Sequence, residues 1–318
     1  MYNEELKTKF IRERTTSLDV ARGYESIFKR IGKFESQFDS DYSTWDCDRL
    51  NDVLKNIVGL RKSTNLVQLS MLKEYVKWRI NNDIDGTNDY IFSINDVGVD
   101  KFKEVTVPNP GYLQRYLDIL FDPESMKTNS NTTRFYFWMA FSGADEEDIF
   151  KIRRSDVDFN KMVIKNTEKD ILYPIYIESL NCMHNCADLN SFLYTNKNYT
   201  NPIIRKRVDG DILIRGVRSI PGIKTMRADI SKKVKALYSE TKMRPTYSSI
   251  RLSGIFYRAY YDEMSGIEPD FKPIVLNDID GKEYALESRR LTENQLIKKK
   301  IKEYNDDYIR WKMAWTYK

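Results

Sequence analysis

The 318-residue chain contains only three cysteines and one histidine. Cys47, Cys182 and Cys186 are too few and too unevenly spaced for a disulfide framework, which favours a reducing cytoplasm. The sequence also lacks an apolar run of about 18 residues, so we expect no membrane span. The first ten residues, MYNEELKTKF, lack the apolar segment of a signal peptide, and secretion is therefore not expected.

Motifs of several common catalytic sites are also missing. The sequence has no glycine-rich phosphate loop, Ser-His-Asp set or paired-carboxylate signature. His184 lies between Cys182 and Cys186 in the segment NCMHNCAD. Alternating positions on one helix cannot converge on one ion and no fourth ligand is evident, so ordinary packing is favoured over zinc. We therefore expect neither a bound metal nor a cofactor.

The composition is that of a soluble globular protein, with 41% hydrophobic and 31% charged residues, and the length favours two domains. The net charge of +5 is distributed unevenly. From Pro202 to Tyr260 there are 14 Lys and Arg residues against 4 Asp and Glu residues. Such a basic block is typical of a protein that binds the phosphate backbone of nucleic acids. A solvated face that balances an acidic one is the alternative.

The first third of the chain has helical spacing of its apolar residues. Helices are predicted at about 17–38, 46–58 and 64–80. The core face of the third is expected to contain Leu66, Leu69, Leu72, Val76 and Ile80. Its opposite side carries Lys73 and Lys77, close to a basic turn formed by Arg61, Lys62 and Ser63. The pattern weakens between residues 81 and 110, so we predict domains at 1–105 and 106–318.

The second domain should combine helices with a small β component. The run FYFWMAF at 135–141 predicts a buried helix that ends at Gly143, and KMVIKNTEKDILYPIYI predicts a β-hairpin with a charged tip. Further helices are expected at about 110–120, 179–192, 225–240 and 246–264. The last helix, from about residue 291, has a heptad seam of Ile297, Ile301, Tyr304, Tyr308, Trp311 and Trp315. Such a seam docks on its own domain or on a neighbouring copy, so a homo-oligomer remains open.

Two segments of this domain carry a resemblance to a known family. They are SGADEEDIFKIRRSDVDF at 142–159 and SSIRLSGIFYRAYYDEMSG at 248–266, separated by the charged hairpin. In this order, after a helical N-terminal domain, they resemble the tyrosine recombinases of the phage integrase family. The resemblance covers about residues 17–266. It implies a fold that is mainly α with a small β component (α+β), in which a helical, SAM-like core-binding domain and a catalytic domain clamp duplex DNA.

Most of the family's catalytic positions hold other residues in this chain. The resemblance implies two arginines, a hairpin lysine, histidines and a tyrosine around the scissile phosphate, where they stabilise charge, transfer protons and form the covalent bond. The first arginine position is Asp145, and the nearby glutamate position is Asp148. The hairpin register favours Glu168 at the lysine position, with Lys165 or Lys169 as alternatives. Ser248 replaces a histidine, Arg251 is retained, and Tyr284 lies near the nucleophile position.

The retained basic residues suggest DNA contacts rather than catalysis. The family's DNA-facing surface corresponds here to Arg153, Arg154, Lys165, Arg205, Lys206, Arg207, Lys224, Arg227, Arg251 and Arg258. An alternative for Arg251 is a buried arginine paired with Asp145 or Asp148. We therefore expect no intact catalytic site, and a DNA-binding transcriptional repressor of a phage or prophage that binds a double-stranded operator. The rival hypotheses are an active recombinase with a rearranged site and an accessory protein of recombination. A regulatory protein partner also remains open.

Overall fold

The computed structural model describes residues 1–57, 59, 62–94, 98, 101–121, 128–194, 203–216, 222–279 and 291–315, without the side chains of 62, 63, 128–130 and 192–194. The described chain is mainly helical with two small antiparallel sheets, which confirms the predicted α+β class. It divides into two compact units, Met1–Phe102 with Lys302–Lys318, and Lys103–Ile301. Each unit is considered separately below.

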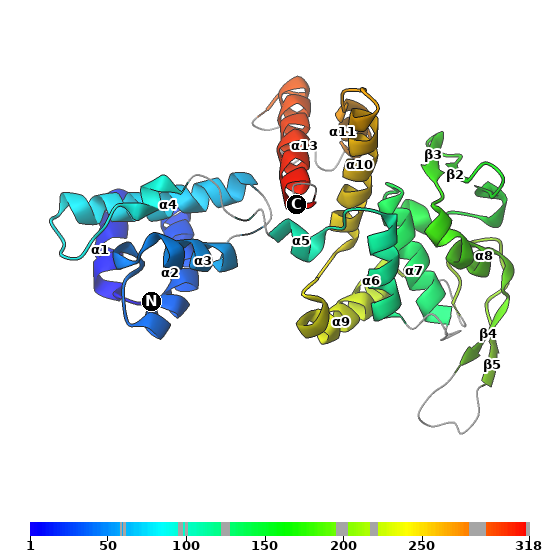
Figure 1. Cartoon of the computed structure of the whole chain (residues 1–318), viewed down its shortest axis with the longest axis horizontal. Helices are drawn as coiled ribbons and strands as arrows, with labels where there is room; N and C mark the ends of the chain where they lie inside the picture. Colours follow the sequence, from blue (N-terminus) through cyan, green and yellow to red (C-terminus); the bar gives the residue numbers. More distant parts are fainter. Residues whose placement is uncertain are drawn as a thin grey trace. The chain divides into compact units, whose positions relative to one another are not determined.

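The N-terminal unit is a bundle of four α-helices. They are α1 (Glu4–Arg14), α2 (Leu18–Phe38), α3 (Cys47–Ile57) and α4 (Lys62–Asn81), accompanied by the 3₁₀ helices η1 (Tyr42–Thr44) and η2 (Tyr90–Ser93) (Figure 1). The sequence predicted α2, α3 and α4 but missed α1. Leu69, Leu72 and Val76 of α4 are buried as predicted, whereas Leu66 and Ile80 are exposed, so the core face of this helix is narrower than expected.

A fully buried ionic network links three parts of this bundle. The Lys7 ammonium of α1 donates 2.6 and 2.5 Å hydrogen bonds to the Glu35 carboxylate of α2. Asp41, in the turn that follows α2, lies 3.8 Å from Lys7 and 2.9 Å from Arg79 of α4. Charges this deeply buried are stable only when they are paired, so the network fixes α1 and α4 against the end of α2.

The C-terminal unit surrounds the helix predicted from FYFWMAF. Its helices are α5 (Lys101–Val105), which begins before the division, α6 (Pro110–Leu120), α7 (Thr128–Phe141), α8 (Leu180–Asp188), α9 (Ile223–Thr241), α10 (Tyr247–Met264), α11 (Lys272–Asp278) and the first part of α13 (Glu293–Trp315), which crosses the division after Ile301. Short 3₁₀ helices are η3 (Asp148–Phe150), η4 (Arg154–Asp156) and η5 (Ile177–Ser179). All seven residues from Phe135 to Phe141 are buried, as the sequence predicts.

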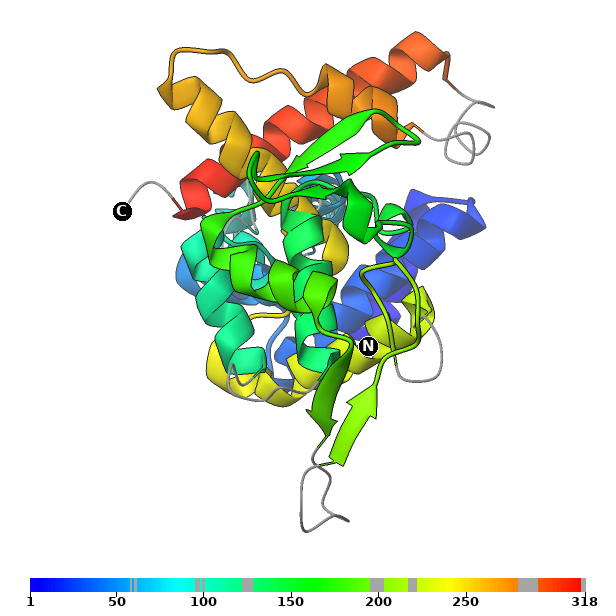
Figure 2. The ribbon, with the colours of Figure 1, turned by 90° about the vertical axis from the view of Figure 1, so that its right-hand side faces the viewer.

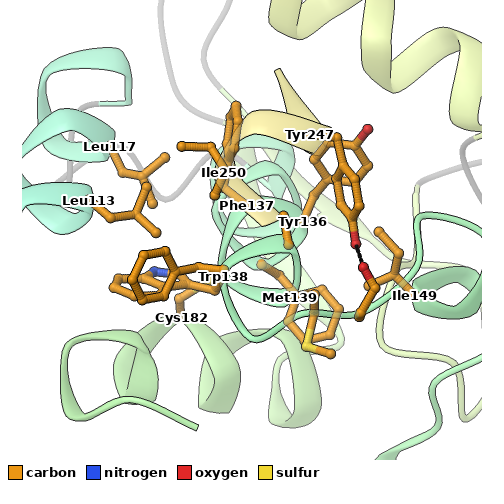
Figure 3. Packing of buried hydrophobic residues seen from close by; sticks show 14 of the residues in the cluster. Leu113, Leu117, Tyr136, Phe137, Trp138, Met139, Ile149, Cys182, Tyr247 and Ile250 are labelled. Carbon is orange, nitrogen blue, oxygen red and sulfur yellow. Dashed lines mark hydrogen bonds between the residues drawn. The ribbon is translucent and has the colours of Figure 1, made fainter. Parts of the chain in front are cut away.

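The core of this unit depends on a close approach of α7 and α10. A Cβ atom at Gly254 would lie 1.6 Å from the carbonyl oxygen of Phe141, so only glycine allows this contact. Tyr136 of α7 and Tyr247 of α10 pack with their ring centroids 4.7 Å apart (Figure 3). The Tyr247 hydroxyl donates a 2.7 Å hydrogen bond to the Ala144 carbonyl and thereby fixes the turn that follows α7.

Two hairpins project from the C-terminal unit in opposite directions (Figure 1 and Figure 2). The first is the predicted charged hairpin, in which β2 (Val163–Asn166) pairs with β3 (Ile171–Pro174), and β1 (Val157–Asp158) joins its edge. The second pairs β4 (Ser191–Tyr194) with β5 (Ile203–Lys206). The sequence did not predict this second hairpin, because its strands are short and β5 belongs to the basic stretch.

The last helix, α13, forms close to the predicted position. Two residues of the predicted heptad seam, Tyr308 and Trp311, are buried. Leu296 and Ala314, which lie outside the seam, are buried as well. Ile297, Ile301, Tyr304 and Trp315 of the predicted seam are half-buried. Within the N-terminal unit, the Arg310 guanidinium lies 4.9 Å from the Phe102 ring, so the end of α13 packs on its own chain. Among the described helices, none is long and apolar enough to cross a membrane.

Candidate functional site

The turn between α7 and η3 positions the residue that the resemblance placed at the first arginine position. Gly143 ends α7 with a φ of +97°, a left-handed conformation that favours glycine. Arg258 of α10 donates a 2.9 Å hydrogen bond to the Phe141 carbonyl and a 3.2 Å bond to the Tyr176 hydroxyl. Arg258 therefore caps the carboxyl end of α7 and holds this turn, a structural role that the sequence did not anticipate.

Arg251 points from α10 into a group of carboxylates. Its Nη1 and Nη2 atoms donate to the two oxygens of Asp278, at 3.1 and 2.7 Å, in a bidentate pair. Its Nη2 atom also lies 3.2 Å from Asp145, and its Nε atom donates to the Gly143 carbonyl at 2.9 Å. Pairing with Asp145 was one predicted alternative, whereas Asp278 had no signal in the sequence. Arg251 is thus held by two carboxylates.

Lys169 approaches the same group of carboxylates from the β2–β3 hairpin. Its ammonium lies 2.7 Å from Asp145 and 2.9 Å from Asp148. Burial alone would lower the pKa of Lys169, but hydrogen bonds to Asp145 and Asp148 raise it above its usual range. Tyr173 donates a 3.2 Å bond to Asp148. Asp145, Asp148, Lys169, Arg251 and Asp278 form the group that we name the carboxylate cluster.

The other hairpin residues lie outside this cluster. Glu168 is at the tip between β2 and β3, as predicted, but it is exposed and pairs with Lys151 at 2.7 Å. Lys165 is exposed and lies 3.6 Å from Asp170. Lys169, one of the two alternatives to Glu168, is therefore the hairpin cation that reaches Asp145.

The start of α10 borders a cavity of about 760 Å³. Ser248, at the histidine position, is exposed and lines this cavity, while Thr246 and Ser249 form the capping box of the helix. Across the cavity, the Arg227 Nε atom of α9 donates a 2.7 Å bond to Glu146. Glu146 also accepts a hydrogen bond from the Tyr136 hydroxyl. Arg227 is still substantially exposed, so its charge is shared between Glu146 and solvent.

The structure separates the predicted DNA-contacting residues into exposed and internal groups. Those with exposed side chains are Lys77, Arg153, Arg154, Lys165, Lys206, Lys224 and Arg227, and Arg205 is half-buried on β5. Arg154 lies 2.6 Å from Asp188. Lys165 is on β2 of the first hairpin and Lys206 on β5 of the second, and the two hairpins project in opposite directions (Figure 1). The predictions for Arg61 and Tyr284, and for the side chains of Lys62 and Ser63, fall outside the described residues.

The structure gives internal contacts to four of the predicted DNA contacts: Arg251 and Arg258, as described above, and Arg207 and Lys73. Arg207 is only 5% exposed, and its Nη1 atom donates to the carbonyls of Asn185 and Cys186 at 3.3 and 3.2 Å. It therefore caps α8 instead of reaching a phosphate. Lys73 donates a 2.7 Å bond to the Ile94 carbonyl and lies 3.4 Å from that of Phe92, so it ties α4 to the segment around η2.

The histidine and the two nearby cysteines face different surroundings. His184 stacks on Phe159 with a centroid distance of 3.8 Å and lies 3.4 Å from Asp188. Cys182 and Cys186 are buried, with Cys182 donating to the Asn131 carbonyl at 3.2 Å. Among the described residues, no group of three or more His, Cys, Asp or Glu side chains could hold a metal ion.

Comparisons with known proteins give one family-model match and similarities to solved structures. Residues 1–81 match the family model described as MrpR, N-terminal core-binding domain. No curated protein matches the chain. The chain is similar to the Tn1549 transposon integrase in complex with a circular intermediate DNA, at 13% identity, covering 81% of this chain and 86% of that chain, with a TM-score of 0.34. It is also similar to XerA recombinase, at 14% identity, covering 79% and 82%, with a TM-score of 0.32.

Proposed function

We propose that the chain binds a specific double-stranded DNA sequence without cutting it, and that it represses transcription as a phage or prophage repressor. The narrower form of this proposal is an integrase-like master repressor of the kind found in SPβ-type phages. One observation carries the non-cleaving part: Arg251 is engaged by Asp278 and Asp145, so its guanidinium is not presented to a phosphate. The match of residues 1–81 to a core-binding domain supports the DNA-binding part.

The charges of the carboxylate cluster oppose phosphoryl transfer. Cleavage through a tyrosine needs cations that stabilise the charge on the scissile phosphate. Here three carboxylates, Asp145, Asp148 and Asp278, surround the two cations Lys169 and Arg251, which leaves a formal excess of one negative charge. A phosphate entering this cluster would have to displace the carboxylates from both cations. The free energy of displacing them would raise the barrier to strand cleavage, the step that the recombinase residues accelerate in the family.

DNA binding without cleavage requires only that cations outside the carboxylate cluster contact the DNA backbone. Exposed cations on α4, α9, the η4 region and β5 could neutralise phosphates and release counterions. Phosphate contacts position a protein on DNA, whereas base edges specify the sequence. A protein that occupies a site and cannot open it blocks polymerase by steric exclusion, and this is the physical basis for the repressor proposal.

A suicide substrate tests the proposal directly. Duplexes enriched by the intact protein from fragmented genomic DNA would supply the bound site, and a nick beside that site would trap any covalent intermediate on a denaturing gel. We expect no covalent band from the native chain or from Asp145→Arg. In that variant Ser248 still occupies the histidine position, and Asp148 and Asp278 still pair with the cations that would have to stabilise the phosphate. A band from the native chain that disappears in Tyr284→Phe would establish a recombinase instead.

The regulatory part has a separate test. Genome-wide occupancy should place the protein at promoters, and deletion of the protein should raise transcription from those promoters. Occupancy confined to one recombination site, without a change in transcription, would favour the accessory role.

A further inference from the structure

The cavity of about 760 Å³ at the start of α10 lies within the C-terminal unit. Its volume is in the range of about 300–1,000 Å³ that is usual for pockets holding small organic molecules. Tyr136 of α7 and Tyr247 of α10 line it, and their rings pack against each other with centroids 4.7 Å apart (Figure 3). The DNA-binding function proposed above does not account for a cavity of this size.

One face of α9 forms a further wall of the cavity. The lining residues on this helix recur every three or four positions and are Arg227, Ile230, Ser231, Val234, Lys235 and Tyr238. Ile230 and Val234 are 7% and 6% exposed and form the apolar part of this wall. Pro245, between α9 and α10, is buried and extends it. Aromatic and aliphatic side chains thus offer a surface on which an apolar body would lose its contact with water.

Two cations besides Arg227 line the same cavity. Lys235 is exposed, and among the described residues it forms no hydrogen bond or ion pair. The Nη2 atom of Arg244 lies 2.9 Å from Glu104, and the side chain is still 54% exposed. The Arg244 guanidinium also lies 5.6 Å from the centroid of the Tyr238 ring. Arg244 is therefore held in place by the fold, whereas Lys235 has its whole charge available for a ligand.

The charge of the cavity is positive. Of its lining residues, all of which the structure describes, only Glu146 is acidic. Glu146 already accepts hydrogen bonds from Tyr136 and Arg227. Three lining cations face this one carboxylate, and Glu104 offsets one of the cations from outside the lining, so one positive charge remains in excess. A positive rim around apolar walls is complementary to an anion that has an apolar body.

We propose that the cavity binds a small amphipathic organic anion. Its apolar or aromatic body packs on Ile230, Val234 and the tyrosine side chains, and its carboxylate, sulfonate or phosphate group pairs with Lys235 and Arg244. The charged group stays at the exposed rim, where solvent limits the cost of removing its hydration. Arg227 remains paired with Glu146. Since all of these residues belong to the C-terminal unit, binding does not depend on whether the chain represses transcription.

A phosphate of the DNA backbone is the alternative occupant, because Lys224 and Arg227 of the same helix were predicted DNA contacts. A phosphodiester would satisfy Lys235 but would leave the apolar walls in contact with water. A neutral apolar molecule would cover the walls but would leave Lys235 unpaired. The apolar walls and the unpaired cation together favour an occupant that has both an apolar body and a negative charge.

The intact chain and two fluorescent probes provide the test, without DNA. The first probe, 8-anilinonaphthalene-1-sulfonate, has an aromatic body and one negative charge, and N-phenyl-1-naphthylamine has the same body without the charge. We expect the sulfonate probe to bind saturably, with one molecule per chain. Binding of many probe molecules without saturation, or no binding, would overturn the proposal.

Charge reversal at the rim tests the role of Lys235. Lys235→Glu should weaken binding of the sulfonate probe about tenfold, because an attraction is replaced by a repulsion near a solvated surface. It should leave the affinity for the neutral probe unchanged. Lys232→Glu is the matched control, since Lys232 is exposed on α9 and does not line the cavity. Equal weakening by the two variants would show an effect of net charge alone and would contradict the assigned site.

Filling the cavity tests its location. Ser231 is an exposed lining residue, so Ser231→Phe should block both probes without disturbing the core, and circular dichroism checks that the variant is folded. Ser239→Phe adds the same ring at an exposed position of α9 outside the lining and should bind as the native chain does. Native affinity in Ser231→Phe would refute the location. Displacement of the sulfonate probe by excess dimethyl phosphate, which has the charge of a phosphodiester without an apolar body, would assign the cavity to the DNA backbone instead.

Discussion

Arg251 is the residue whose predicted role differs most from its contacts in the structure. Its position in the SSIR segment suggests a phosphate ligand, whereas its contacts are those of a structural arginine. Asp278 lies 27 residues further along the chain, and no local pattern indicates such a pairing. The sequence alone shows Asp145 at the position where the resemblance places the family's first arginine. The partner that completes the cluster depends on where α11 packs, which the sequence does not encode locally.

Removing one carboxylate should release part of the positive charge of Arg251. We expect Asp278→Asn to tighten duplex binding by about 1 kcal/mol, roughly fivefold, because one negative charge near the backbone is removed. It should not produce cleavage, since Asp145 and Ser248 remain. Fluorescence anisotropy with a labelled duplex measures the change. Asp262→Asn, an equal charge change at an exposed position of α10, is the matched control. Equal effects of both variants would show that only net charge matters.

Glu35 should give the N-terminal unit a pH-dependent stability. Burial raises the pKa of Glu35 from 4.5 to about 7, although the charge of Lys7 opposes this shift. Between these two values the folded chain retains a proton that the unfolded chain releases, so the free energy of unfolding should fall as pH rises, by about 3 kcal/mol. In the same network the pKa of Asp41 is lowered, so its contribution disappears only at more acidic pH.

Chemical denaturation of the intact chain at several pH values measures this dependence. Glu35→Gln removes the titrating group, so its stability should vary little across the same pH range, and the difference from the native chain should move in favour of the variant as pH rises. A Gln variant that keeps the slope of the native protein would assign the pH dependence to another group.

At the scale of secondary structure, the packing of α7 on α10 is the most constrained contact. Gly254→Ala places a Cβ atom 1.6 Å from the Phe141 carbonyl oxygen, so the helices must separate. We expect stability to fall by about 3 kcal/mol or more, at the upper end of overpacking effects. Gly222→Ala is the control, because nothing lies within 4 Å of its added Cβ. Thermal unfolding of both variants is the measurement, and similar melting temperatures would contradict the close contact.

The β4–β5 hairpin should contribute to backbone binding through β5. Arg205→Glu with Lys206→Glu should reduce the slope of log affinity against log salt by about 0.9 for each phosphate that the protein no longer neutralises. Lys9→Glu with Arg12→Glu on α1 changes the charge equally at a surface that the sequence did not associate with DNA. If the two double variants flatten the slope equally, the hairpin has no specific role. Arg207 is omitted, because reversing a buried charge would unfold its surroundings.

Helices and strands were predicted correctly where their own sequence carries a clear apolar pattern, and were missed where it does not. The FYFWMAF helix and the β2–β3 hairpin were predictable because their apolar patterns are local. Helix α1 was missed because it has only a few buried residues, Lys7, Phe10 and Ile11, and one of them is charged. The hairpin β4–β5 was missed because both faces of β5 are largely exposed, so its sequence has no core-facing alternation.

At the scale of the whole molecule, the two units should divide affinity and specificity. We expect sequence preference to depend on the N-terminal unit, whose residues 1–81 match a core-binding domain. A fragment of residues 106–318, shown to be folded by circular dichroism, should bind duplexes with a weaker preference than the full chain. A selection experiment with random duplexes compares the two. An identical selected sequence from the fragment would place specificity in the C-terminal unit.

The carboxylate cluster also restricts how this protein could evolve. Asp145→Arg alone would place two guanidinium groups side by side, with only Asp278 to balance them near Arg251. Loss of Asp278 alone would leave Arg251 less well neutralised while Asp145 still repels phosphate. The effect of a substitution at Asp145 should therefore depend on the residue at position 278, and that of a substitution at Asp278 on the residue at position 145. This dependence is epistasis, and it would let the two positions change together more readily than one at a time.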